Sequence, residues 1–257
     1  EYVLSFWVLE CDHLEKPYIH RTMADCCPEL LFHYRGRFDE LISDTRTEQS
    51  FTSGIHAASQ KFRRFIINEG FGMFGVALYP FAVPLLSGVS PVEIVNTLPD
   101  IHSLLGRTGR ELEEKMMHAV NNTERARIIS AFLEGRLLKT KLNNRRIVAA
   151  IKHITHLPEP QRIRSVAEHF NVSRRQFERK FKEHSGFNPK LYSRIVRFQR
   201  TVSKYRNGSH RTLTELAYEC GYYDQSHFIH DFKEFSGYHP KQFFSGKATE
   251  ATAFLDD

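Results

Sequence analysis

Short runs of aromatic and aliphatic residues recur through the first 90 residues, separated by proline, glycine and charged clusters. Runs of this length and composition predict β-strands. We place them at residues 2–9, 18–23, 30–34 and 71–79. Short strands closed by turns favour an antiparallel β barrel or sandwich. The interior of such a fold either encloses a ligand cavity or is filled by side chains, and the pattern leaves both outcomes open.

From Pro91 the hydrophobic period becomes helical, with Leu112 and Met116 on one face. The polar run at residues 121–123 interrupts this face, and Asn122 or Thr123 can cap a second helix. We therefore expect a helical hairpin whose apolar face docks either on the strands or on a second copy of the chain. The predicted fold class is α+β, with an all-α region after the hairpin.

A polar, basic segment at residues 139–146 follows the predicted hairpin and contains Leu142 as its single large apolar residue. A segment of this composition is typical of a boundary between domains. The length of 257 residues also suits two domains, each with its own core. We expect one domain over residues 1–140 and a second over residues 141–248.

The second half of the chain contains an internal repeat, in which residues 166–189 align with residues 216–240. The offset is 50 residues at the Ala167/Ala217 pair and 51 at the Phe177/Phe228 pair. The same offset of 51 then holds for the phenylalanine, lysine, glycine and proline that follow in each copy. A single residue inserted in a turn explains the change.

Each copy has the pattern of a helix-turn-helix: a small alanine where two helices meet, a turn, a polar N-cap and an amphipathic second helix. Ser173 and Asp224 are the expected caps, and phenylalanines four residues apart form the buried stripe of each second helix. Gly186 and Gly237 are expected to end these helices in a left-handed conformation, and a proline three residues later prevents continuation.

The exposed faces of the two second helices carry side chains that suit DNA bases. Arginine pairs with guanine, glutamate accepts from cytosine, glutamine pairs with adenine, and serine and histidine suit several partners. The first helix presents Arg174, Arg175, Glu178, Arg179 and Lys180, and the second presents Gln225, Ser226, His227, Ile229 and His230.

One long helix is predicted between the copies. Its apolar face consists of Leu191, Ile195, Phe198, Val202 and Tyr205. Such a connector can place two recognition helices in consecutive major-groove segments, or bend the DNA if it is too short. Its opposite side carries Arg194, Arg197, Arg200 and Lys204, which either contact phosphates or form a solvated basic face.

Charge supports a polyanionic partner for the second half of the chain. The net charge is +6 overall, but residues 1–140 hold 15 basic and 18 acidic residues, whereas residues 141–257 hold 21 basic and 12 acidic residues. The resulting net charges of −3 and +9 place the positive field in the region of the repeat.

Residues 145–244 resemble the DNA-binding domain of the AraC/XylS family of bacterial transcription regulators. The likeness rests on the repeated pattern of alanine, serine, Phe-x-Arg-x-Phe-Lys, glycine and proline, and most on the second copy from Gly221 to Phe228. The resemblance implies seven helices, double-stranded DNA and RNA polymerase as partners, and a place in the bacterial cytoplasm with the nucleoid. It implies base contacts from Arg175, Glu178, Arg179, Gln225, Ser226 and His230. The family often has arginine at the position of His230, so contacts there are expected to be weaker or to depend on pH.

The N-terminal half resembles, less specifically, a sensor-like β domain that precedes some DNA-binding domains of this type. Residues 27–34 and 72–80 carry the likeness. It implies effector sensing or dimerisation, by analogy alone.

Other chemistry receives little support from the sequence. Four cysteines without a C-x-x-C pair indicate a reducing compartment rather than a disulfide framework. Cys11, His13 and the Cys26-Cys27 pair offer soft metal ligands, but buried cysteines explain them better. His20, His33 and His56 are expected to be satisfied structural histidines, so we predict no metal site and no cofactor. The uncharged stretch 70–92 is broken by prolines and glycines, which argues against a membrane span.

No phosphate-loop, dinucleotide or nucleophile-elbow pattern is present, so we expect no enzyme. The sequence predicts a sequence-specific DNA-binding transcription regulator, modulated through its N-terminal domain by a small-molecule effector or by formation of a homodimer. The alternative is a small-molecule sensing module whose ligand response, rather than constitutive DNA binding, is the primary activity.

Overall fold

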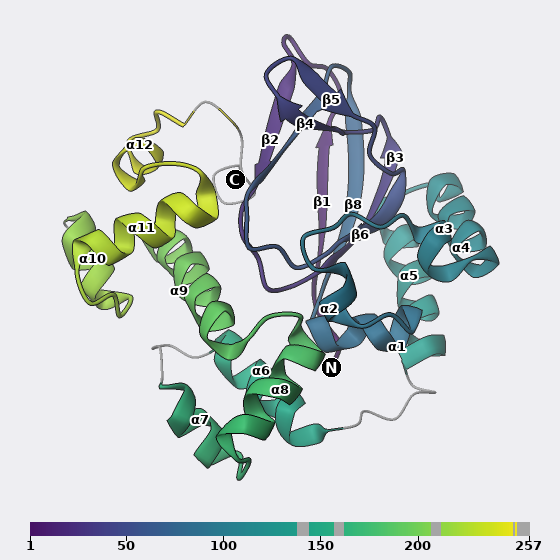
Figure 1. Cartoon of the computed structure of the whole chain (residues 1–257). Helices are drawn as coiled ribbons and strands as arrows, with labels where there is room; N and C mark the ends of the chain where they lie inside the picture. The colour runs from purple at the N-terminus through teal and green to yellow at the C-terminus, as the bar shows by residue number, and fades with distance from the viewer. Residues whose placement is uncertain (138–143, 157–161, 207–211, 249, 251–257) are drawn as a thin grey trace.

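The computed structural model describes residues 1–137, 144–156, 162–206, 212–248 and 250 (Figure 1). In this part of the chain the strands come first, ending at Leu78, and the helices follow from Pro80 onward. The α+β class predicted from the hydrophobic pattern is confirmed.

The N-terminal region contains two antiparallel four-stranded sheets. The first has the order β1 (Val3–Cys11), β8 (Phe71–Leu78), β3 (Glu29–Arg35) and β6 (Ser53–His56). The second has the order β2 (Tyr18–Thr22), β7 (Arg63–Ile67), β4 (Asp39–Ser43) and β5 (Arg46–Glu48). Among the described residues no strand of one sheet pairs with a strand of the other, so the region is an open sandwich and the barrel alternative is wrong.

The four predicted strands correspond to β1, β2, β3 and β8, and the prediction missed the four strands between β3 and β8. β5 consists of three exposed residues, and β7 begins with two arginines. β6, although fully buried, has the sequence Ser-Gly-Ile-His. Strands of such mixed composition carry at most a short apolar run, and pairing with neighbours holds them extended.

Trp7 on β1 lies opposite Gly75 on β8, and this pairing needs a glycine. A Cβ atom at position 75 would lie 2.1 Å from Cε2 of the Trp7 ring, which is far below contact distance. The indole therefore lies flat across the backbone of β8, and its Nε1 donates to Oε1 of Glu29 over 2.9 Å.

Six helices lie between the sheets and residue 137 in the described chain: η1 (Pro80–Ala82), α1 (Val83–Ser87), α2 (Pro91–Ile94), α3 (Ile101–Leu105), α4 (Arg107–His118) and α5 (Asn122–Leu137). α4 and α5 form the expected hairpin and bury Leu112, Met116 and Ile129 in one cluster with strand residues of the first sheet. The face therefore docks within the chain. The cap of α5 is Asn121, whose Oδ1 accepts the Glu124 N–H over 2.9 Å, rather than Asn122 or Thr123.

The uncharged stretch 70–92 does not form a continuous helix. It folds as β8, η1 and α1 and reaches the beginning of α2. In the ranges that the structure describes, every helix is too short or too polar to cross a lipid bilayer.

The C-terminal region contains seven helices among its described residues, as the resemblance implied. They are α6 (Arg145–His156), α7 (Ile163–His169), α8 (Arg174–Ser185), α9 (Pro189–Arg206), α10 (Leu213–Glu219), α11 (Gln225–Ser236) and α12 (Pro240–Phe244). α9 is the predicted connector, and it joins the α7–α8 pair to the α10–α11 pair (Figure 1).

One hydrophobic cluster joins the two halves of the chain. Met23, Ala24 and Cys26, which follow β2, share this cluster with Tyr192 of α9 and Phe235 of α11. All five are nearly or completely buried. The helical region is therefore packed against the sheets through a continuous core.

Candidate DNA-binding site

The two helix-turn-helix units share the backbone geometry of their turns. In the first, the Val172 N–H donates to the Ala167 carbonyl, and in the second the Tyr222 N–H donates to the Ala217 carbonyl, both over 3.0 Å. The residues before these donors, Asn171 and Gly221, have positive φ angles of 53° and 77°. The repeat inferred from sequence is thus a structural duplication.

Tyr223 is the inserted residue that changes the offset between the copies. The offset is 50 residues up to Tyr222 and 51 from the helix caps onward. The Tyr223 side chain is 86% exposed at the beginning of the second recognition helix. Sequence comparison located an insertion in this turn but did not single out this residue.

Both predicted caps and both predicted stops are confirmed. Ser173 accepts the Gln176 N–H over 3.5 Å, and Asp224 accepts the His227 N–H over 2.7 Å. Gly186 and Gly237 follow α8 and α11 with φ angles of 84° and 76°. These local bonds set the direction of each recognition helix.

The first recognition helix, α8, buries Phe177 and exposes a basic face. Arg174 and Arg179 are exposed, and each is bound to a glutamate one turn later on the same helix. The pairs are Arg174–Glu178 and Arg179–Glu183, both at 2.9 Å. Exposed pairs of this type contribute little stability, so a phosphate or a base edge can replace the glutamate at low free-energy cost.

A basic recess of about 440 Å³ lies between the N-terminal end of α6 and α8. Arg145, Arg146, Arg179 and Lys180 line it. Arg146 also donates to the Asn171 carbonyl over 3.2 Å and so stabilises the turn of the first unit. The sequence analysis treated residues 139–146 only as a boundary, and the part up to residue 143 lies outside the described residues.

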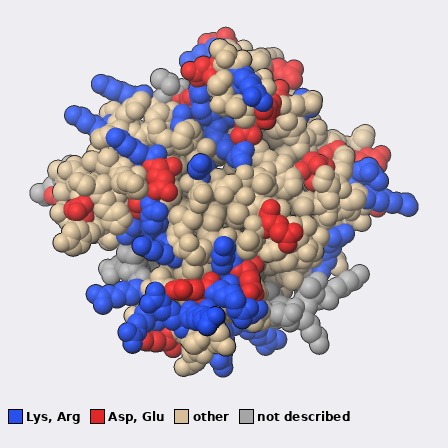
Figure 2. Space-filling model, in the orientation of Figure 1, with Lys and Arg blue, Asp and Glu red and all other residues tan. Residues whose placement is uncertain are grey.

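The second recognition helix, α11, has a different electrostatic character. α8 contains five basic and two acidic residues, a net charge of +3, whereas α11 contains one basic and two acidic residues, a net charge of −1. Figure 2 accordingly shows Lys and Arg gathered over α6, α7 and α8. On α11, Gln225 and Ser226 are exposed and the His230 side chain is 72% exposed. The second unit therefore offers neutral hydrogen-bonding groups rather than positive charge.

Arg194 and Arg197 point from α9 toward α11 and bind Asp231, whose side chain is only 1% exposed. The nitrogen–oxygen distances are 2.7 Å for Arg194 and 3.1 Å for Arg197. Arg194 also reaches Glu234 over 2.5 Å, and Arg197 donates to the Gly221 carbonyl. The two arginines expected at phosphates thus hold the second unit against the connector.

Of the other two basic residues expected on this side of the connector, one is paired and one is half-buried. Lys204 pairs with Glu219 of α10 over 2.8 Å. Arg200 is half-buried, and its burial lowers the pKa of its guanidinium. Three of the four basic residues expected on this side of α9 therefore bind acidic residues of α10 or α11.

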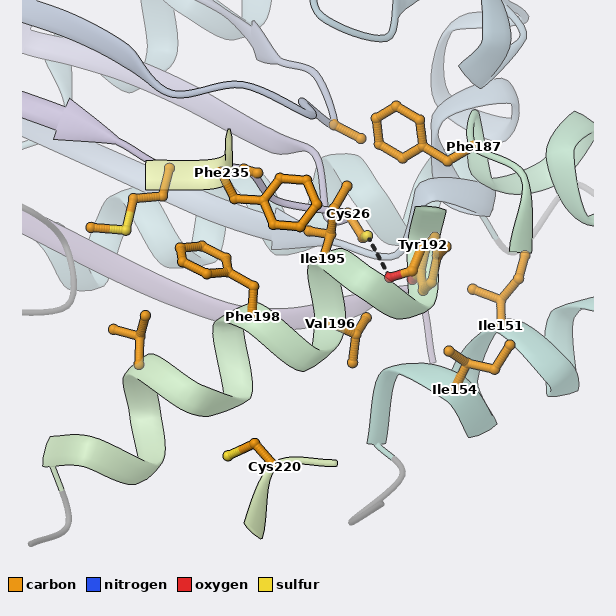
Figure 3. Packing of buried hydrophobic residues seen from close by; sticks show 14 of the residues in the cluster. Cys26, Ile151, Ile154, Phe187, Tyr192, Ile195, Val196, Phe198, Cys220 and Phe235 are labelled. Carbon is orange, nitrogen blue, oxygen red and sulfur yellow. Dashed lines mark hydrogen bonds between the residues drawn. The ribbon is translucent and has the colours of Figure 1, made fainter. Parts of the chain in front are cut away.

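The end of β2 and the segment after it hold the end of α11, a relationship that sequence analysis did not detect. The Ala24 N–H donates to the Phe235 carbonyl over 2.9 Å, and Arg21 donates to the Ser236 carbonyl over 3.1 Å. Arg21 also pairs with Glu250 at 2.6 Å. Figure 3 shows Cys26 against α9, where its thiol donates to the Tyr192 carbonyl over 3.6 Å. The sheets thus contact the connector and the second recognition helix directly.

The candidate metal ligands named from sequence do not form one group. Among the described residues, the group close enough to hold a metal is His230, Asp231 and Glu234. Arg194 binds the carboxylates of both Asp231 and Glu234, so its guanidinium already balances their negative charge. Cys26 is buried, and burial raises the pKa of its thiol.

The expectation of satisfied histidines holds for two of three. His33 contacts the Thr52 carbonyl at 3.2 Å, and His20 contacts the Tyr18 hydroxyl at 3.4 Å. His56 contradicts it, because its Nε2 is buried and has no hydrogen-bond partner in the described structure. The reason is that β6 places this ring against a cavity between the sheets.

In the comparison with known proteins, one family model matches the region that contains the strands and another matches the helical C-terminal region. Residues 166–246 match the family model described as a helix-turn-helix domain, and residues 1–100 match a domain of unknown function (DUF6597). The HTH-type transcriptional activator RhaS of Salmonella arizonae is 32% identical over 92 residues, which are 36% of this chain and 33% of RhaS. The chain thus spans about a third of the length of the curated relatives it matches.

Two solved structures are similar at low identity. ToxT from Vibrio cholerae O395 is 14% identical, with a TM-score of 0.48 over 94% of this chain and 96% of ToxT. A regulator with an AraC-type DNA-binding domain from Chromobacterium violaceum is 22% identical, with a TM-score of 0.37 over 42% of this chain and 96% of that protein. The assignment rests instead on the duplicated turn and the family match, which identify residues 166–246 as a helix-turn-helix domain.

Proposed function

We propose that the protein is a sequence-specific DNA-binding transcription regulator that reads DNA with both helix-turn-helix units. The observation that carries this proposal is the structural duplication: two capped recognition helices on one connector, each with a polar face in solvent. Two such helices fit consecutive segments of a major groove, directly or with bending of the duplex.

In this proposal the first unit supplies both affinity and base contacts. Arg174, Arg175, Glu178 and Arg179 meet base edges from α8. Arg145 and Arg146, in the recess beside them, bind the DNA backbone. Phosphate contacts of this kind give binding its dependence on salt.

The second unit supplies discrimination with little charge. Base edges are contacted by Gln225, Ser226, His227 and His230. Tyr223 contacts the DNA backbone beside these bases. Arg194 and Arg197 act as positioning residues through Asp231, and a direct phosphate contact by either one stays a prediction. Because α11 has a net charge of −1, its contribution depends less on salt than that of α8.

We further propose the division into an N-terminal domain at residues 1–140 and a DNA-binding domain at residues 141–248, with the first modulating the second. Support comes from the bonds of Arg21 and Ala24 to the last turn of α11. A small-molecule effector or a homodimer contact would act through these bonds. RNA polymerase as a partner, and a place at the bacterial nucleoid, follow from the regulator role.

The experiment is selection of genomic fragments by the full chain in the presence of competitor DNA, at two salt concentrations, with the mass of the complex measured. Enrichment of a defined fragment, with affinity that falls as salt rises, supports the proposal. Equal, weak binding to all fragments contradicts it. The mass of the complex gives the number of protomers on the site.

The second candidate function is a small-molecule sensor whose ligand response is the primary activity. The observation that favours it is a cavity between the two sheets. This function predicts two results. The ligand raises the melting temperature of the protein in the absence of DNA, and the protein selects a DNA fragment only when the ligand is present.

A further inference from the structure

A cavity of about 430 Å³ lies inside the N-terminal sandwich. Trp7, Val8 and Leu9 line it from β1, and His20 and Thr22 line it from β2. β1 and β2 are the terminal strands of their sheets and do not pair with each other. The cavity lies between the two sheets and reaches both of these terminal strands, and its volume is in the range of small-molecule sites.

The walls are mainly aromatic and aliphatic, and burial shifts the pKa of their histidines and acidic groups toward the uncharged forms. Burial lowers the pKa of His20 and His33 to about 4 and that of His56 to about 3. Burial, with the nearby Asp25, raises the pKa of Glu29 to about 8. Burial also raises the pKa of Asp25. At pH 7 the histidines are therefore neutral and Glu29 is mostly protonated.

The cationic group in the wall is already paired. Arg21 binds the carboxylate of Glu250 and the carbonyl of Ser236. A ligand carboxylate would have to displace Glu250, and a ligand ammonium would meet neutral imidazoles and the mostly protonated Glu29. Charged ligands therefore lose their hydration without gaining a counter-ion.

Two polar atoms in the wall lack partners in the described structure. Nε2 of His56 and Oγ1 of Thr22 are both buried, and neither makes a hydrogen bond. Both residues line the cavity, from β6 and β2. Buried polar atoms without partners are rare in folded proteins. A ligand hydroxyl can pair with an atom of either kind, because it can both donate and accept a hydrogen bond.

We propose that this cavity binds an uncharged, largely apolar aromatic molecule that carries a hydroxyl or carbonyl group, which hydrogen-bonds to His56 and Thr22. The assignment of the cavity is independent of DNA binding. The regulatory consequence rests on the proposed function.

One segment connects the cavity to the second recognition helix. Arg21, Thr22, Met23 and Asp25 line the cavity, and Ala24 between them donates to the Phe235 carbonyl at the end of α11. A ligand that shifts this segment shifts α11 with it. Occupancy therefore changes the affinity of the second unit for DNA.

The test uses Trp7, because the chain has a single tryptophan and it lines the cavity. Labelling with 5-fluorotryptophan yields one ¹⁹F resonance. The labelled full chain is titrated at pH 7 with 2-naphthol, naphthalene and 2-naphthoate, and calorimetry measures each dissociation constant. We expect 2-naphthol to shift the resonance and to bind about tenfold more tightly than naphthalene, and 2-naphthoate not to bind. Equal or tighter binding of 2-naphthoate, or no shift with any probe, overturns the proposal.

Two variants test the hydrogen bonds. His56→Leu and Thr22→Val each remove an unpartnered polar atom of the cavity wall. Each should abolish the tenfold preference for 2-naphthol and leave naphthalene binding unchanged. The matched control is His102→Leu, which removes an exposed histidine on α3, away from the cavity lining. An unchanged preference in both cavity variants overturns the assignment. DNA selection is measured separately, so probe binding without fragment selection counts against the proposed function alone.

Discussion

Oδ2 of Asp231 on α11 lies 3.1 Å from a guanidinium nitrogen of Arg197 on α9, and the two side chains are 1% and 12% exposed. The guanidinium of Arg197 also lies over the Tyr222 ring at 4.2 Å from its centroid. The pair joins the connector to both the turn and the recognition helix of the second unit. The orientation of that unit therefore depends on an interaction that is almost entirely buried.

The Asp231→Asn variant tests this role. Two arginines would keep their positive charge while losing their buried anion, so we expect the free energy of unfolding to fall by about 3 kcal/mol. Chemical denaturation of the full chain measures the change. Glu234→Gln is the control, because Glu234 is 38% exposed and its pair with Arg194 should contribute less than about 1 kcal/mol. Similar losses in both variants would contradict a special role for Asp231.

The Arg179→Ala variant tests base contact by the first unit. Loss of a contact to a guanine edge should weaken specific binding by about 1–3 kcal/mol and relax preference at one base pair. Binding to the selected fragment and to its single-base variants measures both effects. Arg127→Ala, an exposed arginine on α5, is the control and should change neither. Equal losses on specific and nonspecific DNA would make Arg179 a phosphate contact instead.

The Arg145→Ala variant tests the basic recess. A lost phosphate contact weakens binding to all sequences alike and lowers the slope of log affinity against log salt by about 1. Fluorescence anisotropy at several salt concentrations measures that slope. Gln225→Ala should behave in the opposite way, with a changed base preference and an unchanged slope. A base-specific effect of Arg145→Ala would rule out a pure backbone contact.

The raised pKa of Glu29 predicts that the protein becomes less stable as the pH rises. Its folded-state pKa of about 8 lies above the ordinary value of 4.5, so the folded state binds more protons than the unfolded state between these values. Stability contributed by this group is present at low pH and is lost as pH rises through the window, by an amount on the order of a few kcal/mol. In Glu29→Gln, which retains an acceptor for the Trp7 indole, this loss between pH 5 and 8 should be smaller. Thermal denaturation at several pH values measures it, and an identical pH profile would contradict the assignment.

The lowered pKa values of the buried histidines predict that stability falls as the pH falls below 6.5. The folded-state pKa values of His20 and His33 are about 4 and that of His56 is about 3, below the ordinary value of 6.5. Their contribution to stability is present above pH 6.5 and is lost as pH falls toward 4. His56→Leu should therefore weaken the acid destabilisation, whereas His102→Leu should not. Denaturation between pH 4 and 7 distinguishes the two.

The sequence by itself determined the helix-turn-helix repeat, both caps at Ser173 and Asp224, and the long connector. Each of these depends on residues three or four positions apart on one helix, or on one side-chain bond to a nearby N–H, and such local interactions are readable from spacing. The four strands between β3 and β8 were not readable, because their extended form depends on partners distant in the chain.

Tertiary structure alone decided what several side chains do. Arg194 and Arg197 have the spacing of a phosphate-binding face, but the position of Asp231 on another helix turns them inward. His56 looks like an ordinary strand histidine, but the opposite sheet leaves a cavity beside it. The partners of a charged or polar group depend on how helices and strands distant in the sequence pack together. The residues next to that group in the sequence therefore do not predict its partners.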